Sequence, residues 1–511
     1  MKNKVFIFGS KLIKYLFYFL FLLTCYFAIT SPNLILGDNN VTGSGTTIVT
    51  ALFIITALIV IGTFLTFESW ADLLKYIFID RQWVTSITSL SVVVIIQIVF
   101  VLNVHPAIGF DPGAIHRALI QTTDIETRAY FSLNMNNIAT MLWQHQLALF
   151  FKNHSWLLFD LITLFFVDLS AVLNICSVLV IDPKKVPLAI YMHALWLSVF
   201  PMIIVPYTDA WVLPFVSMYI FLYCLLRYGK LNLIWKSIVA LLLGITVAGT
   251  YFIKPSAIIG IIAIGLIELL YLFKGKFSKE RMIIEFILGL IILIGAVPTY
   301  SITNYAIDHQ KYIKVNAERA IVPLHFISMG VSGDGGYNAH DALMMAKMPS
   351  KQAQTAYSKK VLEKRLQKKG FWGYLKFLLQ KHANNTADGT FAWIKEGHFI
   401  SDNPKPSSKG LAGKIRNFVY LYGKNLGDFR YIAQVWWVFL LATILFNWKD
   451  DRKIVQLLRL TIIGGFMFLL IFEGGRSRYL IQFLPAFLIL SALSWGKSWQ
   501  KLTELFAWTK L

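Results

Sequence analysis

Long apolar runs alternate with short polar segments along most of the chain. The apolar core of a bilayer, about 30 Å thick, requires roughly 20 apolar residues in a helix. Runs of that kind occur at about 12–30, 47–66, 84–103, 156–181, 188–205, 212–227, 234–252, 256–273, 283–301, 431–447, 454–472 and 479–496. The pattern therefore predicts an all-α polytopic membrane protein with about 12 transmembrane helices.

The composition supports this fold class. The chain has 511 residues, of which 57% are hydrophobic and 15% charged, and its mean hydropathy is +0.61. A soluble protein carries roughly 25% charged residues, so a large water-soluble enzyme is excluded, as are a disordered chain and a coiled coil. Cys25, Cys176 and Cys224 all lie inside apolar runs, which excludes a disulfide framework.

The net charge of +21 bears on topology. In a membrane protein Lys and Arg mark cytoplasmic loops and anionic headgroups before they mark nucleic acid. The loops at 182–185, 227–230, 274–281 and 449–453 are basic, whereas 31–46 and 206–211 contain no Lys or Arg. We therefore expect a multi-pass protein of the cell membrane with both termini cytoplasmic. The first apolar run follows several lysines and is interpreted as a retained anchor.

Two outer segments are long, and they divide the chain. Residues 1–83 form two N-terminal transmembrane helices, and 84–301 a transmembrane core that includes the first outer loop, 104–155. A large extracytoplasmic loop follows at 302–430, and C-terminal transmembrane helices at 431–511. The large loop contains 20 Lys plus Arg and 9 Asp plus Glu. Long loops cross the membrane largely regardless of charge, so the expected orientation stands.

Two carboxylates stand out at the outer boundary. Asp111 follows the third apolar run, and Pro112 favours an extended backbone at Asp111. Asp111 is either an N-cap of the next helix or a general base held at the membrane surface. Asp209 lies in the short turn 206–211, where it is either a solvated turn residue or a second functional carboxylate.

Three outer cations depart from the charge rule. Lys254 lies between two apolar runs and next to Pro255, where it either snorkels to headgroups or binds a phosphate. Arg476 and Arg478 lie in the last outer turn. Arginine suits bidentate binding of phosphate, although a headgroup anchor is the alternative.

Other polar groups point to no single chemistry. Asp160 and Asp168 lie within one predicted span, where we expect structural hydrogen bonds inside the bundle. His325, His340 and Asp341 belong to two glycine-rich segments of the large loop, which form either an acceptor-binding loop or ordinary turns. No Cys/His metal spacing, Walker loop, nucleophile elbow or dinucleotide fingerprint appears. No cofactor is assigned, and a divalent metal is an open alternative.

The order of these features resembles the GT-C superfamily of membrane glycosyltransferases, which includes protein mannosyltransferases and the aminoarabinose transferase of lipid A. The resemblance covers residues 84 to about 495. The matching features are, in chain order, Asp111, an interfacial helix at 130–151, Tyr207-Thr208-Asp209, Lys254, and Arg478-Tyr479-Leu480 with Pro485 downstream. The Lys, Ile and Asn content is typical of an AT-rich Gram-positive bacterium, and a branch associated with exosortase-like systems is one placement.

The resemblance implies a reaction and its participants. A polyprenyl-phosphate-linked sugar is the donor, and the acceptor is an extracytoplasmic protein, wall polymer or lipid. Asp111 is the implied catalytic base, with Asp209 as the second catalytic candidate. The donor phosphate is held by Lys254, Arg476, Arg478 and Tyr479. Only Asp124 and Glu126 follow Asp111, in place of the adjacent acidic pair usual in the family, and this leaves metal dependence open.

Chemical logic supports the same reaction, with two alternatives. No nucleotide sugar is available on the outer face, and a polyprenyl phosphate leaving group needs cations rather than a general acid. Attack on the face opposite the phosphate inverts the anomeric centre. A transporter or flippase of a lipid-linked glycan would place its charges near the bilayer midplane, often within repeats. A non-catalytic scaffold that binds anionic wall polymer is the third interpretation. Nucleic acid is not expected as a partner.

Overall fold

The computed structural model describes residues 2–275, 278–395, 399–401, 406 and 409–505. These residues form helices and no strand, apart from one antiparallel bridge between Ile108 and Ile400. Within them, eleven helical segments are long and apolar enough to cross a membrane: 3–34, 48–66, 82–103, 156–181, 208–228, 233–253, 255–272, 279–308, 426–445, 453–471 and 477–498. The predicted all-α polytopic membrane fold is confirmed.

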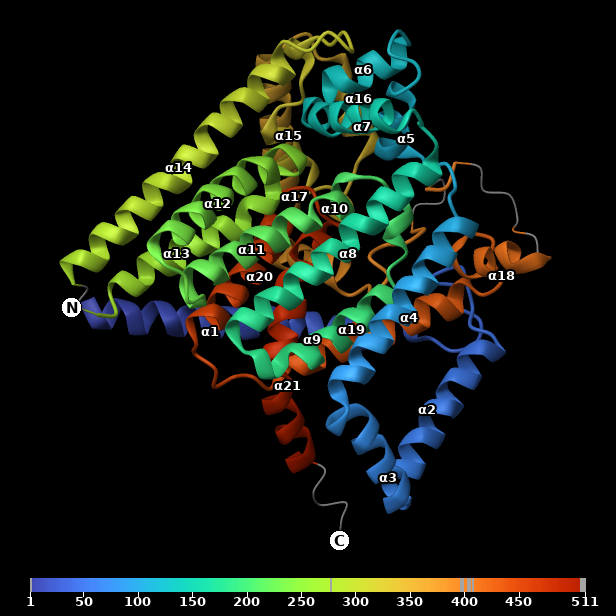
Figure 1. Cartoon of the computed structure of the whole chain (residues 1–511). Helices are drawn as coiled ribbons and strands as arrows, with labels where there is room; N and C mark the ends of the chain where they lie inside the picture. Colours follow the sequence, from blue (N-terminus) through green and yellow to red (C-terminus); the bar gives the residue numbers. More distant parts are fainter. Residues whose placement is uncertain (1, 276–277, 396–398, 402–405, 407–408, 506–511) are drawn as a thin grey trace.

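The long helices that supply most of these segments are α1 (Lys2–Ile29), α2 (Ile48–Thr66), α4 (Gln82–Asn103), α8 (Trp156–Ile181), α11 (Leu213–Tyr228), α12 (Leu233–Ile253), α13 (Ile259–Leu272), α14 (Lys279–Asp308), α19 (Leu426–Leu445), α20 (Lys453–Ile471) and α21 (Leu484–Leu505). Figure 1 shows α8, α11 and α12 side by side through the middle of the molecule, with α14 along one flank. The helices α2 and α3 (Glu68–Lys75) project away from this bundle.

Shorter helices connect and cover the bundle: α5 (Phe110–Ala118), α6 (Ile125–Leu133), α7 (Ile138–Phe151), α9 (Val186–Ser198), α10 (Thr208–Trp211), α15 (Pro323–Met329), α16 (Ala339–Lys347), α17 (Lys351–Thr386) and α18 (Gly410–Val419). Short 3-10 turns include η3 (Met135–Asn137), η5 (Pro201–Ile204), η6 (Pro255–Ile258), η7 (Ala317–Arg319) and η8 (Ser477–Phe483). In Figure 1, α5, α6, α7 and α16 gather at one end of the molecule.

Ion pairs mark the two ends of the bundle. At one end, here called the aspartate end, Lys254 of α12 bonds to Asp209 of α10. At the opposite, basic end, Arg227 of α11 and Lys453 of α20 both pair with Glu268 of α13. The helices α11 and α13 run toward the basic end, whereas α12 and α20 run toward the aspartate end. The chain therefore alternates between these ends, as the charge pattern predicts.

The predicted span at 188–205 is not one helix. The helix α9 ends at Ser198, and η5 follows after a break. Pro201 explains the break, because proline has no N–H for the helical bond and restricts the residue before it. The segment still crosses the bundle: Lys185 lies against Gly496, while Asp209 pairs with Arg478 before α21 begins.

Two local expectations near Asp111 are wrong. Asp111 is the second residue of α5 rather than an extended residue ahead of a helix. Proline is tolerated in the first helical turn, so Pro112 fits there, and Phe110 makes the entry with a φ of 53°. The stretch 130–151 is likewise not one helix, since a turn at Asn134 and η3 separate α6 from α7.

Candidate functional site

A buried ion-pair cluster lies at the aspartate end. The Nζ atom of Lys254 donates to Oδ1 of Asp209 at 2.7 Å, and Nε of Arg478 lies 3.4 Å from Oδ2 of the same carboxylate. The Asp209 side chain is 5% exposed, against 13% for Lys254 and 17% for Arg478. One carboxylate therefore shares two cations that arrive from different helices.

Local backbone geometry explains how Lys254 reaches Asp209. Lys254 is the extended residue that follows α12 and caps its end, with φ −155° and ψ 100°, as expected for a residue that precedes proline. The side chain therefore leaves the end of the helix. On the other side of the pair, the turn before Asp209 is fixed by Gln144 of α7, whose buried amide donates to the Pro206 carbonyl at 2.9 Å.

Asp111 accepts hydrogen bonds from two tyrosines. The Tyr130 hydroxyl donates to Oδ1 at 2.8 Å, and the Tyr207 hydroxyl donates to Oδ2 at 3.1 Å. The Asn137 amide donates to the Tyr130 hydroxyl at 2.6 Å, while its carbonyl oxygen accepts from Tyr207 at 3.4 Å. No side-chain cap is formed at the start of α5, so the N-cap interpretation of Asp111 is not supported.

The two tyrosines remain proton donors. Burial, followed by the neighbouring Asp111 carboxylate, raises the pKa of Tyr130 and Tyr207 well above the ordinary value of 10.0. Both hydroxyls therefore keep their protons at neutral pH and direct them at the carboxylate. This arrangement holds the Asp111 carboxylate in one orientation.

Tyr207 joins the two carboxylates into one site. It bonds to Asp111 and lies two residues before Asp209 in the same turn. Asp111 is also close enough to act electrostatically on Arg478. The structure therefore brings together Asp111, Asp209, Lys254 and Arg478, which the sequence singled out separately.

The last outer turn divides its two arginines. Arg478 faces Asp209, and its guanidinium lies 5.2 Å from the centroid of the Tyr479 ring. The Tyr479 hydroxyl donates to Glu473 at 3.1 Å. Arg476 instead pairs with Asp334 of the large loop. Burial opposes the charge of Asp334, but the bond from Arg476 outweighs it and lowers the pKa of that carboxyl. Arg478 and Tyr479 thus belong to the cluster, whereas Arg476 connects the same turn to the large loop through Asp334.

Two side chains of α17, which sequence reasoning missed, hold this turn in place. The fully buried Lys381 donates to the carbonyl oxygens of Phe472 and Gly330 at 2.6 Å each and of Leu470 at 3.1 Å. Asn385 accepts from the Gly475 N–H at 2.6 Å. Lys381 lies in a lysine-rich stretch with no distinguishing pattern, so the sequence offers no signal for it.

The weak acceptor-binding candidates lie elsewhere in the large loop. Asp341 forms a bidentate pair with Arg365 of α17, at 2.6 and 2.8 Å, and has a packing role. His325 is buried, and burial lowers its pKa below 6.5. His340 is 74% exposed. Within the described residues, none of these three side chains forms a hydrogen bond or an ion pair with Asp111 or Asp209.

Asp160 and Asp168 of α8 lie apart from this cluster in the sequence, inside one candidate membrane span. Within the described part of the chain, neither oxygen of Asp160 has a hydrogen-bond partner, nor does Oδ1 of Asp168, so the structural hydrogen bonds expected there are not formed. Among the described residues there is no group of three or more His, Cys, Asp or Glu side chains placed to hold a metal ion.

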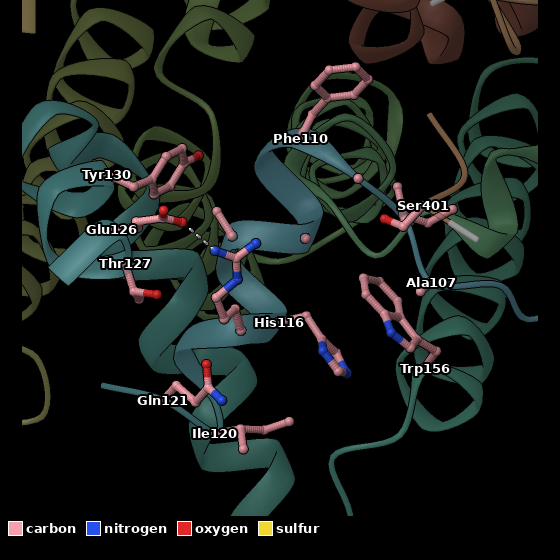
Figure 2. Close-up of a pocket in the computed structure, with 15 residues that line it drawn as sticks. Ala107, Phe110, His116, Ile120, Gln121, Glu126, Thr127, Tyr130, Trp156 and Ser401 are labelled. Carbon is pink, nitrogen blue, oxygen red and sulfur yellow. Dashed lines mark hydrogen bonds and ion pairs between the residues drawn. The ribbon is translucent and has the colours of Figure 1, made fainter. Parts of the chain in front are cut away.

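A hollow of about 560 Å³ lies next to the start of α5, where Phe110 and Gly113 line it. Figure 2 shows the side chains around it. Its walls come from α5, α6, the start of α8 and Ser401. Asp111 itself does not line it, but Tyr130, which bonds to Asp111, does. Asp111 is therefore linked to the hollow through Tyr130 and to the turn that holds Asp209 through Tyr207.

These features define the class of this molecule as a polytopic integral membrane protein with a buried charge cluster at one end of its bundle. The chain belongs to the family described as conserved hypothetical integral membrane protein, whose model matches residues 5–499. No curated protein and no solved structure matches the chain. The family description names membrane integration and no reaction.

Proposed function

We propose that the protein is a membrane glycosyltransferase that moves a sugar from a polyprenyl-phosphate donor to an acceptor outside the cytoplasm, with inversion. The observation that carries the proposal is the convergence of a tyrosine-held carboxylate, Asp111, with two buried cations, Lys254 and Arg478, at one end of the bundle.

In this proposal the two cations stabilise the leaving phosphate. The transferred sugar leaves a polyprenyl phosphate, whose growing negative charge needs positive groups in a site with little water. Lys254 supplies a compact charge, and Arg478 supplies a planar fork suited to phosphate oxygens. Asp209 pairs with both cations. Asp209 is therefore a positioning residue that keeps Lys254 and Arg478 together until an anion arrives.

Asp111 takes the acceptor proton in the same proposal. The acceptor hydroxyl attacks the anomeric carbon, its O–H bond breaks, and the proton passes to Asp111 while the bond to phosphate breaks. Each carboxylate oxygen accepts one tyrosine hydroxyl and keeps a second lone pair for this proton. The two hydrogen bonds fix the direction of the Asp111 carboxylate, and orientation is part of what such a base contributes.

The test replaces Asp111 with Asn. Loss of the base should lower transfer by about 10²- to 10⁴-fold, with binding of a polyprenyl phosphate unchanged. Asp124→Asn is the matched control, because Asp124 caps α6 in the same outer segment and Asn caps equally well. Transfer is measured with purified protein and a panel of polyprenyl-phosphate sugars. Wild-type turnover in Asp111→Asn would remove Asp111 from the mechanism.

A separate binding measurement tests the cations. Lys254→Ala and Arg478→Lys should each weaken binding of a polyprenyl phosphate, and Arg478→Lys tests the fork rather than the charge. Because this assay needs no acceptor, it separates the phosphate site from the base. Unchanged affinity in both variants would rule out the phosphate site.

One observation favours the alternative of a transporter or flippase. Asp160 and Asp168 lie inside α8 with unpartnered oxygens, and carboxylates within a span frequently mark ion pathways. Reconstitution in liposomes with a fluorescent lipid-linked sugar distinguishes the two functions. Movement of the intact lipid between leaflets, abolished by Asp160→Asn, would favour transport over transfer.

A further inference from the structure

The hollow next to the start of α5 has the dimensions and lining of a ligand site. Its volume of about 560 Å³ falls within the range of roughly 300–1,000 Å³ typical of small-molecule pockets. One wall is held together across the chain: Gly109 donates its N–H to the Phe399 carbonyl, and Ser401 donates its N–H to the Ala107 carbonyl, both at 2.9 Å. The large loop therefore builds this wall against the segment that precedes α5.

Two stacked rings extend into the hollow. His116 of α5 and Trp156, the first residue of α8, have ring centroids 4.1 Å apart and an interplanar angle of 12°. Figure 2 shows both side chains inside the hollow. The His116 Nε2 donates to the His154 carbonyl at 2.8 Å, which leaves Nδ1 as an acceptor in the neutral ring. Burial lowers the pKa of His116 below 6.5, so the ring is neutral at pH 7.

Polar side chains, several of them with planar end groups, surround these rings. Arg117 pairs with Glu126 at 3.2 Å, and their side chains are 50% and 79% exposed. Gln121 and the Ser401 hydroxyl add further donors and acceptors. Arg117 and Glu126 are the charged side chains among the described lining residues, and their charges cancel. The lining therefore suits a neutral ligand rich in hydroxyl groups better than a phosphate.

We propose that this hollow binds a sugar ring of a glycan acceptor, with Trp156 and His116 as the platform and Arg117 and Glu126 as partners of its hydroxyl groups. Sugar rings present one apolar face of C–H groups and an edge of hydroxyls, which matches an aromatic surface bordered by planar polar groups. Tyr130 lines the hollow and bonds to Asp111, whereas Asp111 itself does not line it, so the hollow holds a part of the acceptor that does not react. That the bound sugar belongs to the acceptor rests on the proposed function. Binding of a sugar in the hollow does not, because it requires no transfer.

The experiment measures sugar binding without a donor lipid. The full chain is placed in phosphatidylcholine nanodiscs, because a maltoside detergent would itself compete. Saturation-transfer NMR is recorded with cellotriose, maltotriose and the trimer of N-acetylglucosamine, and inorganic pyrophosphate serves as the anionic probe. We expect at least one trisaccharide to receive saturation and pyrophosphate to compete weakly or not at all.

Variants locate the binding. Trp156→Leu keeps an apolar side chain but removes the ring and should weaken binding at least about fivefold. Trp372→Leu is the matched control, because Trp372 is a 78% exposed tryptophan on α17, away from the hollow. Arg117→Gln provides a second, exposed test if Trp156→Leu melts at a lower temperature than the wild type.

Each outcome decides. Trisaccharide binding that Trp156→Leu or Arg117→Gln weakens and Trp372→Leu does not supports the hollow. Absence of a signal from every trisaccharide, equal binding in all variants, or preferential binding of pyrophosphate overturns it. Sugar binding combined with full turnover in Asp111→Asn would contradict the proposed mechanism but not the sugar site. Donor-dependent transfer without sugar binding would contradict the sugar site but not the proposed mechanism.

Discussion

The carboxylates Asp111 and Asp209 use their oxygens differently, and this difference is not visible in the sequence. Both were singled out in the sequence because each lies at the outer boundary of an apolar run. In the structure Asp111 accepts hydrogen bonds from two neutral tyrosines, while Asp209 accepts one from Lys254 and forms an ion pair with Arg478. Charge exceptions along the chain predicted the members of the site, but the pairing depends on elements that meet only in the folded bundle.

At this scale, Asp209→Asn should destabilise the protein strongly. Removing one partner of a buried ion pair leaves uncompensated charge, which costs about 3 kcal/mol or more. Here two cations, Lys254 and Arg478, lose their shared partner. Glu126→Gln serves as the exposed control and should cost less than about 1 kcal/mol. The free energy of unfolding in detergent, measured with a chemical denaturant, compares the two. Equal effects would contradict the buried pairing.

A second prediction at this scale concerns Lys381 and pH. Burial outweighs the nearby Glu473 and Asp334 carboxylates and lowers the pKa of Lys381 from 10.5 to about 8. The unfolded chain therefore binds more protons than the folded protein between these values. The contribution of Lys381 to stability is constant below the lower value and rises with pH through the window.

The measurement compares melting temperatures of wild type and Lys381→Met from pH 7 to 10. Because the variant lacks the titrating group, the wild-type value minus the variant value should increase above pH 8. A difference that stays level or narrows across that range would show that Lys381 titrates normally.

At the scale of elements, apolar run length predicted helices well and breaks poorly. Eleven of the predicted spans correspond to helical segments of sufficient length in the described residues. In the exception, α9 ends at Ser198 and Pro201 begins η5 after a break, and hydropathy alone does not penalise a proline. The α6–η3–α7 segment also escaped prediction, because its turn at Asn134 depends on packing rather than on a strong breaker.

Close packing of α12 against α14 yields a prediction for one glycine. A Cβ atom at Gly244 would overlap the backbone carbonyl of Ile292, and one at Gly295 would overlap that of Leu241. Small residues allow such backbone approach between membrane helices. Gly244→Ala should therefore destabilise the protein by about 1–3 kcal/mol.

Gly289, which lies on α14 together with Gly295, provides the control for this prediction. It has no atom within 4 Å of an added Cβ, so Gly289→Ala should leave the melting temperature unchanged or slightly raised. Thermal melting of the two variants in the same detergent is sufficient. A tolerated Gly244→Ala would show that α12 and α14 can separate without cost.

At the scale of the whole molecule, both terminal helices reach the basic end. Lys14 of α1 pairs with Asp451, and Lys497 of α21 lies 3.4 Å from Asp450. Since Asp209 lies at the opposite end, Lys14 and Lys497 are separated from the candidate site by the thickness of the bundle. The relation follows from the folded chain, while its direction across the membrane remains the prediction made from the basic loops.

Cysteine labelling tests that direction. In a background without Cys25, Cys176 and Cys224, a membrane-impermeant maleimide should modify Lys359→Cys, in α17, on intact cells. Lys184→Cys, in the basic loop after α8, should react only after the membrane is permeabilised. Modification of both positions on intact cells would refute the predicted orientation.

The shared partnership of Asp209 also has a consequence for biosynthesis. Lys254 emerges from the ribosome 45 residues after Asp209, which at about 5–20 residues per second takes about 2–9 s. Arg478 follows Asp209 by nearly 270 residues, a delay of about 13–54 s at the same rate. From the synthesis of Lys254 until that of Arg478, the nascent chain contains both carboxylates and one cation of the cluster without the second cation. A polypeptide released before Ser477 would therefore insert most of its helices and still lack a finished charge cluster.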